Sequence, residues 1–248
     1  MKSARIRLAG SGQVITVPAE SVPAGATWEA PVTGTVYGVV LNDQASLDKL
    51  GDALLEAPYK GKPKAPALYI KPENTLVGHG ATVTLPARCT ELAIGATVGL
   101  VIGETASKVS PADALKHVRG YTVVMDLSIP HASVYRPAIR EKCFDGACPV
   151  GPVVVDRAKV GDPTGLTIRT FINGTQVAER KLSDLVRSIP QLMADVTEFM
   201  SLLPGQVLLP AVPLDVPTAK AGDKVAVEID GIGRLEITLK ETSAGGQA

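Results

Sequence analysis

Apolar and polar residues alternate in short runs along most of this chain, and glycine or proline ends most of the runs. Such alternation is typical of strands that bury one face, with turns at the breaks. A first strand is predicted over 36–41, and an Asn-Gly pair at 173–174 predicts a tight hairpin turn. Many short strands with few helices predict a mostly β, mixed α+β fold. The later strands are predicted at 67–70, 82–85, 96–102, 121–127, 153–156, 166–171, 207–209, 224–229 and 233–239.

Helical spacing of apolar residues is confined to a few segments. The clearest segment follows Ser188, a favourable N-cap residue, and has Pro190 in its first turn. The Pro-Gly pair at 204–205 stops it. Two shorter helices are predicted over 47–55 and 111–118.

The first residues of the chain form a pattern of their own. Two alternating runs joined by a Gly-Ser-Gly turn predict a small two-stranded appendage over 1–34, because several prolines then break the chain. The main domain is predicted over 35–240. The Gly-, Ser- and Gln-containing end at 241–248 predicts a flexible tail.

Composition excludes several classes of protein. The 248 residues carry 25 basic and 25 acidic side chains, so no net charge favours nucleic acid or an anionic membrane. The N-terminus has no continuous apolar stretch that would form a signal peptide or a membrane span. Three cysteines are too few for a disulfide framework. We therefore expect a cytoplasmic protein that binds neither nucleic acid nor membrane.

Two residues are the main candidates for chemistry. Asp126 ends an apolar strand, and a rigid strand aims a carboxylate well as a metal ligand or a general base. The alternative for such an aspartate is to cap a neighbouring turn. Lys142 lies on a Gly- and Pro-rich stretch, where a desolvated ammonium stabilises an enolate. The alternative for Lys142 is a solvated loop lysine.

Other cationic residues predict an anion site in the same part of the chain. Lys71 opens a loop that also carries an amide, a hydroxyl and an imidazole, although such loops are more often simple turns. Arg136 and Arg140 lie close to Lys142 in sequence. Several cations in an otherwise neutral protein favour an anionic ligand. We therefore predict that Lys71, Arg136 and Arg140 bind a carboxylated substrate.

The order of these motifs resembles the fumarylacetoacetate hydrolase family. Lys71-Pro is followed by Gly-x-Gly, a Gly-Tyr-Thr-Val-x2-Asp run ends at Asp126, and Lys142-x2-Asp-Gly leads to Pro-x-Gly-Pro. The resemblance covers roughly residues 35 to 240. The run 135–149 is most similar to the N-terminal half of the bifunctional isomerase/decarboxylases of 4-hydroxyphenylacetate (homoprotocatechuate) breakdown.

The resemblance implies a mixed β-sandwich or roll, paired about a two-fold axis, in an enzyme of aromatic catabolism that acts on small 2-oxo acids. Members hold Mg2+ or Mn2+ through two glutamates and an aspartate, and a lysine stabilises the enolate. Asp126 and Lys142 match the aspartate and the lysine, whereas Gly95 and Thr97 replace the glutamates. One carboxylate holds such a cation weakly. The lid positions of a histidine and a glutamate are aligned with Ser46 and Lys49.

Three interpretations follow. The first is a subunit of a decarboxylase/isomerase for unsaturated 2-oxo acids, whose related, ligand-intact partner performs the metal-dependent step. The second is a non-catalytic structural or binding subunit. The third is an independent enzyme that uses Lys142 and Asp126 without metal. All three are compatible with a homodimer or with a heteromer that includes a ligand-intact relative.

Overall fold

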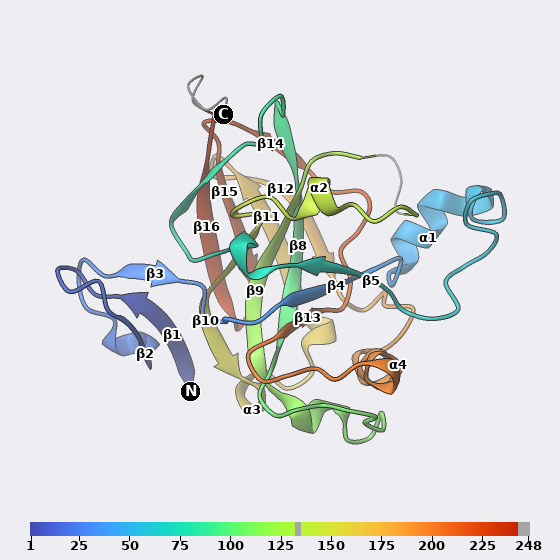
Figure 1. Ribbon diagram of the computed structural model, residues 1–248, viewed down its shortest axis with the longest axis horizontal. Helices are drawn as coiled ribbons and strands as arrows, with labels where there is room; N and C mark the ends of the chain where they lie inside the picture. Colours follow the sequence, from blue (N-terminus) through green and yellow to red (C-terminus); the bar gives the residue numbers. More distant parts are fainter. Residues whose placement is uncertain (132–134, 243–248) are drawn as a thin grey trace.

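The computed structural model describes residues 1–131 and 135–242. Within that part of the chain, the strands form an eleven-stranded sheet and a five-stranded sheet (Figure 1). Four α-helices and several short 3-10 turns connect them in the described part. The predicted mostly β, mixed α+β class is confirmed. The segment 243–248, most of the predicted tail, lies outside the described residues.

The larger sheet carries two of the candidate residues, Lys71 and Asp126. Its main path has the order β2-β1-β10-β9-β8-β13-β4-β5, and β3, β6 and β14 pair with strands of that path. Its strands are β1 Lys2–Arg7, β2 Val14–Pro18, β3 Thr27–Glu29, β4 Val36–Val40, β5 Ala67–Lys71, β6 Leu76–Val77, β8 Glu91–Ile102, β9 Val118–Ser128, β10 Cys148–Asp156, β13 Val207–Leu209 and β14 Thr218–Lys220.

The smaller sheet has the order β12-β11-β15-β16-β7. The predicted hairpin turn is confirmed, since Asn173 and Gly174 join β11 and β12 with φ values of 51° and 83°. Its strands are β7 Ala81–Thr84, β11 Thr167–Ile172, β12 Thr175–Lys181, β15 Lys224–Ile229 and β16 Gly233–Lys240.

The helices are few and mostly short, as the sequence predicts. The strongest prediction is confirmed, because the Ser188 hydroxyl accepts a hydrogen bond from the Gln191 amide at the start of the longest helix. The predicted helix over 111–118 is wrong, because only a 3-10 turn forms before Val118 enters β9. The α-helices are α1 Gln44–Leu50, α2 Ile139–Lys142, α3 Arg157–Val160 and α4 Ile189–Phe199, and the 3-10 turns are Ala19–Ser21, Gly51–Leu54, Glu73–Thr75, Ala114–His117 and Pro163–Gly165.

The N-terminal strands extend the main sheet. β1 pairs antiparallel with β10, and it also pairs with β2 and with a third strand, β3, which the sequence did not predict. Figure 1 shows these strands projecting to one side of the molecule. The predicted division at residue 34 therefore separates segments that share one hydrogen-bonded sheet.

The long strands β8 and β9 position the candidate site. On β9, Met125 and Leu127 belong to the main buried cluster, together with residues of the smaller sheet such as Leu235. Because side chains alternate along a strand, Asp126 points to the opposite face. The antiparallel register places Gly95 across from Asp126 and Thr97 across from Val124. None of the described helices is long and apolar enough to cross a membrane.

Candidate functional site

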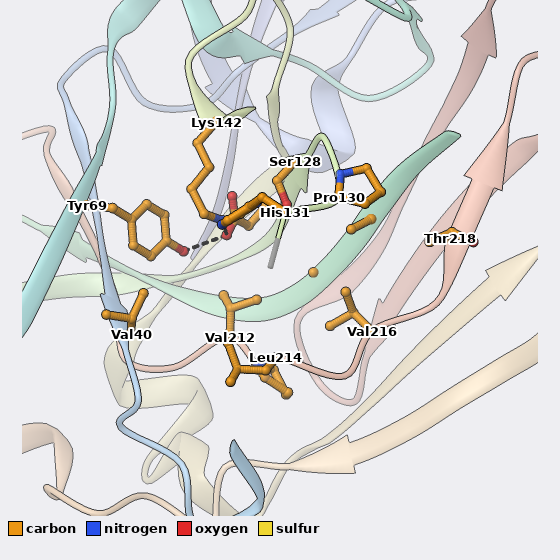
Figure 2. Close-up of a pocket in the computed structure, with 14 residues that line it drawn as sticks. Val40, Tyr69, Ser128, Pro130, His131, Lys142, Val212, Leu214, Val216 and Thr218 are labelled. Carbon is orange, nitrogen blue, oxygen red and sulfur yellow. Dashed lines mark hydrogen bonds and ion pairs between the residues drawn. The ribbon is translucent and has the colours of Figure 1, made fainter. Parts of the chain in front are cut away.

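A buried carboxylate forms the centre of the site. Asp126 is 1% exposed, and three side chains bind it. Lys71 Nζ lies 2.7 Å from Oδ1, while Lys142 Nζ and the Tyr69 hydroxyl each donate to Oδ2 at 2.7 Å. Figure 2 shows Tyr69 and Lys142 converging on this carboxylate. Asp126 therefore joins β5, β9 and α2, and the alternative that it caps a turn is wrong.

Lys71 is an internal part of this cluster. Its side chain is 0% exposed at the end of β5. Besides Asp126, its ammonium donates to the carbonyls of Leu127 at 2.5 Å and Ala147 at 2.9 Å. Two carbonyl oxygens and the ion pair with the Asp126 carboxylate thus enclose the ammonium of Lys71. The predicted contact of Lys71 with a substrate finds no support in this buried position.

Lys142 has a different environment. It is the last residue of α2, and its side chain is 11% exposed, so the solvated-loop alternative is wrong. Its ammonium donates to Asp126 and lies 4.4 Å from the centre of the Tyr69 ring. Within the described residues, Asp126 is its hydrogen-bond acceptor. N–H groups of Lys142 are therefore left for a ligand.

Tyr69 is a functional residue that our sequence analysis missed. Strand alternation gives the signal once β5 is seen to include Lys71, one residue beyond the predicted strand, because Tyr69 and Lys71 then fall on the same face. Gly38, on the neighbouring β4, leaves the space that the Tyr69 ring occupies. A Cβ atom at Gly38 would overlap the Tyr69 ring, so the ring packs directly on the β4 backbone. Tyr69 then reaches Asp126 from the edge of the sheet.

Charge coupling fixes the ionisation of the cluster. Burial by itself would raise the pKa of Asp126, but Lys142 and Lys71 outweigh it and hold this pKa below its usual value. Burial, followed by the Asp126 charge, raises the pKa of Tyr69 well above its usual value. Burial lowers the pKa of Lys71 against the opposing effect of Asp126, and the ion pair with Asp126 favours the ammonium form of this lysine. Two ammonium groups and one carboxylate leave one positive charge.

This cluster borders a small cavity of about 200 Å3, which we call the lysine hollow. Figure 2 shows Lys142, Ser128 and His131 close together, with Val212 and Leu214 facing them. The His131 ring presents Nδ1 to the Ile129 carbonyl oxygen at 3.0 Å. The lysine hollow is lined by Val40, Tyr69, Ala93, Gly95, Asp126, Ser128, Pro130, His131, Lys142, Val212, Pro213, Leu214, Val216 and Thr218.

Val212 fills the space beside Gly95. A Cβ atom on Gly95 would lie 2.5 Å from Val212 Cγ1 and 2.9 Å from the Asp126 carbonyl oxygen. Real Cβ atoms do not approach other atoms so closely. A glutamate cannot therefore be placed at position 95 unless Val212 moves. The nearby Thr97 is fully buried, and its hydroxyl has no hydrogen-bond partner among the described residues.

Comparisons with known proteins identify the scaffold. The model of the fumarylacetoacetate (FAA) hydrolase C-terminal domain matches residues 35–240. The chain belongs to the fumarylacetoacetate hydrolase family. It is 38% identical over 203 residues to the 4-hydroxyphenylacetate degradation bifunctional isomerase/decarboxylase of Escherichia coli, an alignment that covers 82% of this chain and 46% of that protein. The chain spans about half the length of the three curated bifunctional isomerase/decarboxylases that it matches.

Solved structures agree with this assignment. The 5-carboxymethyl-2-hydroxymuconate delta-isomerase of Mycobacterium smegmatis has a TM-score of 0.80 and 25% identity, and the alignment covers 98% of this chain and all of that one. Fumarylpyruvate hydrolase of Pseudomonas aeruginosa, solved with Mn2+ and pyruvate, has a TM-score of 0.74 and 21% identity over 90% of this chain and 94% of that one. The predicted family fold is confirmed.

The residues of this family member do not fit a divalent cation. Asp126 is the carboxylate of the lysine hollow, and two ammonium groups already occupy its oxygens. In the described part of the chain, no group of three or more His, Cys, Asp and Glu side chains is placed to hold a metal ion. Mg2+ and Mn2+ require several oxygen ligands that carry negative charge. A centre with one net positive charge repels such an ion, so the Asp126 cluster is unsuited to bind a divalent cation.

The lid positions of this family member have structural contacts. The Ser46 hydroxyl accepts a hydrogen bond from the Leu214 amide at 2.9 Å, and Lys49 pairs with Asp215 at 2.9 Å. The hydrogen bond and the ion pair both join α1 to the loop at 211–217. Both residues line a separate cavity, the α1 hollow, on the other side of β8 from the lysine hollow. Its lining is Ala45, Ser46, Lys49, Ile94, Ala96, Ile168, Thr170, Ala178, Glu179, Arg180, Asp184, Pro213, Asp215, Val216 and Pro217.

The two predicted arginines have different positions. Arg136 is exposed and lines a cavity next to the lysine hollow. Arg140 is exposed on α2 and lines neither cavity, so the structure gives no support to its predicted contact with a substrate. Lys142 lines both cavities.

Proposed function

We propose that this chain is a subunit of a bifunctional decarboxylase/isomerase that acts on unsaturated 2-oxo acids in 4-hydroxyphenylacetate breakdown. The reactions are decarboxylation of 5-oxopent-3-ene-1,2,5-tricarboxylate and isomerisation of 2-hydroxyhepta-2,4-diene-1,7-dioate. A related chain with intact ligands performs the metal-dependent step. The E. coli relative, which is about twice the length of the match, supports an assembly of two such units.

The observation that supports this proposal is that lysine side chains bind the Asp126 carboxylate. Both of its oxygens are bound by lysines inside an otherwise preserved family scaffold. Electrostatic stabilisation of an enolate needs positive charge near the 2-oxo group. In this chain the Lys142 ammonium supplies that charge from a desolvated position, and its unused N–H groups donate to a substrate carboxylate or oxyanion.

A second candidate is a non-catalytic binding or structural subunit. The packing of Val212 against Gly95 favours it, because the position of a metal ligand is filled by an apolar side chain. Such a subunit stabilises its partner and contributes no group to the reaction. The two candidates differ in whether Lys142 affects turnover.

The test measures decarboxylation of the unsaturated tricarboxylate in the ultraviolet with magnesium present. The chain is assayed alone, and then mixed with a ligand-intact family member. We expect the mixture to be more active than the ligand-intact chain alone. In the Lys142→Met variant, this increase in activity should be at least tenfold smaller. A gain that survives Lys142→Met supports the non-catalytic subunit. A mixture with neither a complex nor a gain overturns both. Activity of the chain alone would show that the replacement of the glutamates by Gly95 and Thr97 does not disable the site.

A further inference from the structure

Another cavity lies between the strands β4 and β5 and the chain that follows α1, and we call it the loop hollow. Its volume is about 530 Å3, and small-molecule sites in proteins occupy roughly 300–1,000 Å3. Figure 1 shows the chain between α1 and β5 on the side of the molecule opposite the N-terminal strands. The lining contains neither Asp126 nor any residue that binds it, and consists of Val40, Leu41, Tyr59, Lys60, Gly61, Lys62, Pro63, Lys64, Ala67 and Tyr135.

Positive charge dominates the loop hollow. Lys60, Lys62 and Lys64 line it, and no carboxylate does so within the described residues. The acidic residues of the same stretch, Asp52 and Glu56, are exposed and lie outside the lining. No ion pair joins any of the three lysines to a carboxylate in the part of the chain that the structure describes. Three like charges around one cavity repel one another, so an anion placed between them is attracted by all three.

The α1 hollow provides a comparison, because its volume of about 560 Å3 is similar. Its cations are paired. Lys49 lies 2.9 Å from Asp215, and Arg180 lies 3.8 Å from Asp184. Glu179 adds a further carboxylate to that lining. Charge therefore favours an anion in the loop hollow and not in the α1 hollow.

The loop that carries the three lysines has a fixed backbone. The Arg187 guanidinium donates to the Pro63 carbonyl at 3.0 Å, and the Lys60 amide donates to the Glu56 carbonyl at 2.9 Å. Both bonds use backbone atoms of the loop, so they leave the lysine ammonium groups available. Neighbouring surface lysines are usually only solvated, but this loop gathers them around one cavity before a ligand binds, which lowers the entropy cost of binding.

Aromatic rings form another part of the wall. Tyr59 and Tyr135 line the loop hollow, and their ring centres lie 6.1 Å apart at an interplanar angle of 86°. In such an edge-to-face pair, each ring leaves at least one face that the other ring does not cover. Planar bases stack on tyrosine faces of this kind. The loop hollow therefore combines a cluster of ammonium groups with a surface for a flat ring.

We propose that the loop hollow binds a nucleoside diphosphate, at a site separate from that of the proposed function. The three lysines hold the phosphates, and the base stacks on Tyr59. A diphosphate concentrates several negative charges in two adjacent groups, and ammonium groups bind phosphate as point charges. A carboxylate is matched better by the forked guanidinium of arginine, and no arginine lines the loop hollow within the described residues.

The experiment compares three ligands by calorimetry on the full chain, without magnesium. ADP carries both the phosphates and a base, pyrophosphate lacks the base, and adenosine lacks the phosphates. We expect the native protein to bind ADP at least tenfold more tightly than either of the other two. The triple variant Lys60→Gln/Lys62→Gln/Lys64→Gln should weaken the binding of ADP and of pyrophosphate at least tenfold.

A second triple variant, Lys159→Gln/Lys220→Gln/Lys240→Gln, is the matched control. These lysines are exposed and lie outside the loop hollow, so their loss changes the net charge of the protein equally. The control should leave the affinity for ADP within twofold of the native value. Equal weakening by the two triple variants overturns the proposal, because the effect is then general surface charge.

Tyr59→Leu tests the aromatic wall. It should weaken ADP at least fivefold and leave pyrophosphate unchanged, and the retained pyrophosphate binding shows that the variant is folded. Equal affinity of the native protein for ADP and pyrophosphate overturns the nucleoside class, and absence of ADP binding overturns the site itself. Each variant keeps Asp126 and Lys142, so these outcomes are independent of the proposed function.

Discussion

The lysine hollow and the α1 hollow lie on opposite sides of β8, yet they hold charge in different ways. Gly95 faces the first, and its neighbours Ile94 and Ala96 face the second. In the lysine hollow, the side chains of Asp126 and Lys142 are 0% and 11% exposed, and the Asp126 carboxylate is bound by two lysines and Tyr69. In the α1 hollow, the paired side chains of Lys49 and Asp215 are 52% and 85% exposed.

This difference in exposure explains why the chain has Asp126 although Gly95 and Thr97 replace the two glutamates that bind metal in the family. Water stabilises an exposed ion when its partner is lost, so an exposed pair is easily replaced. A buried ammonium has no such substitute, and Lys71 and Lys142 both depend on Asp126. The carboxylate is therefore required by the fold itself. Its presence in this chain is not evidence that a metal binds.

The largest loss of stability is expected when the buried Asp126 carboxylate is removed. Asp126→Asn leaves two ammonium groups facing an amide, and we expect the free energy of unfolding to fall by about 3–5 kcal/mol. Chemical denaturation measures the change. Asp52→Asn is the control, because Asp52 is exposed, and it should alter stability by less than about 0.5 kcal/mol. A similarly small loss at position 126 would contradict the structural role of the carboxylate.

Much of the fold follows from local sequence patterns. The Ser188 cap and the Asn173-Gly174 turn are confirmed because residues adjacent in sequence favour both, and Asp223 and Lys224 add hydrogen bonds to Asn173. The segment 111–118 shows the limit of such patterns. The Asp113 amide donates to the Ser110 hydroxyl there, but Val118 pairs with Ile102 of β8, so only a 3-10 turn forms before β9 begins. Tertiary contacts overrule local preference at that point.

The site is predictable in part for the same reason. Asp126 and Lys142 can be found from motif order, and the absence of glutamates at 95 and 97 is visible directly. The contact of Val212 with Gly95 joins residues far apart in the chain, and sequence periodicity does not contain it. The contacts of the Lys71 ammonium are likewise set by the meeting of β5, β9 and the start of β10.

A smaller loss of stability is expected from a substitution that displaces Tyr69, one of the residues that line the lysine hollow. Gly38→Ala places a methyl group against the Tyr69 ring, so we expect the ring to shift and stability to fall by about 1–3 kcal/mol. Thermal and chemical unfolding measure the loss. Gly165→Ala is the matched control, because a Cβ atom there meets no atom within 4 Å. Equal stability of the two variants would show that Tyr69 is not held against β4.

The smallest effect is expected on the other side of β8. Lys49→Met removes one partner of an exposed ion pair, and the freed Asp215 carboxylate remains hydrated. We expect the free energy of unfolding to change by less than about 0.5 kcal/mol. Lys71→Met is the paired measurement, since it removes a fully buried cation and should cost several times more. A loss at Lys49 as large as that at Lys71 would mean that the α1 hollow depends on its charges as strongly as the lysine hollow does, and the contrast between the two would fail.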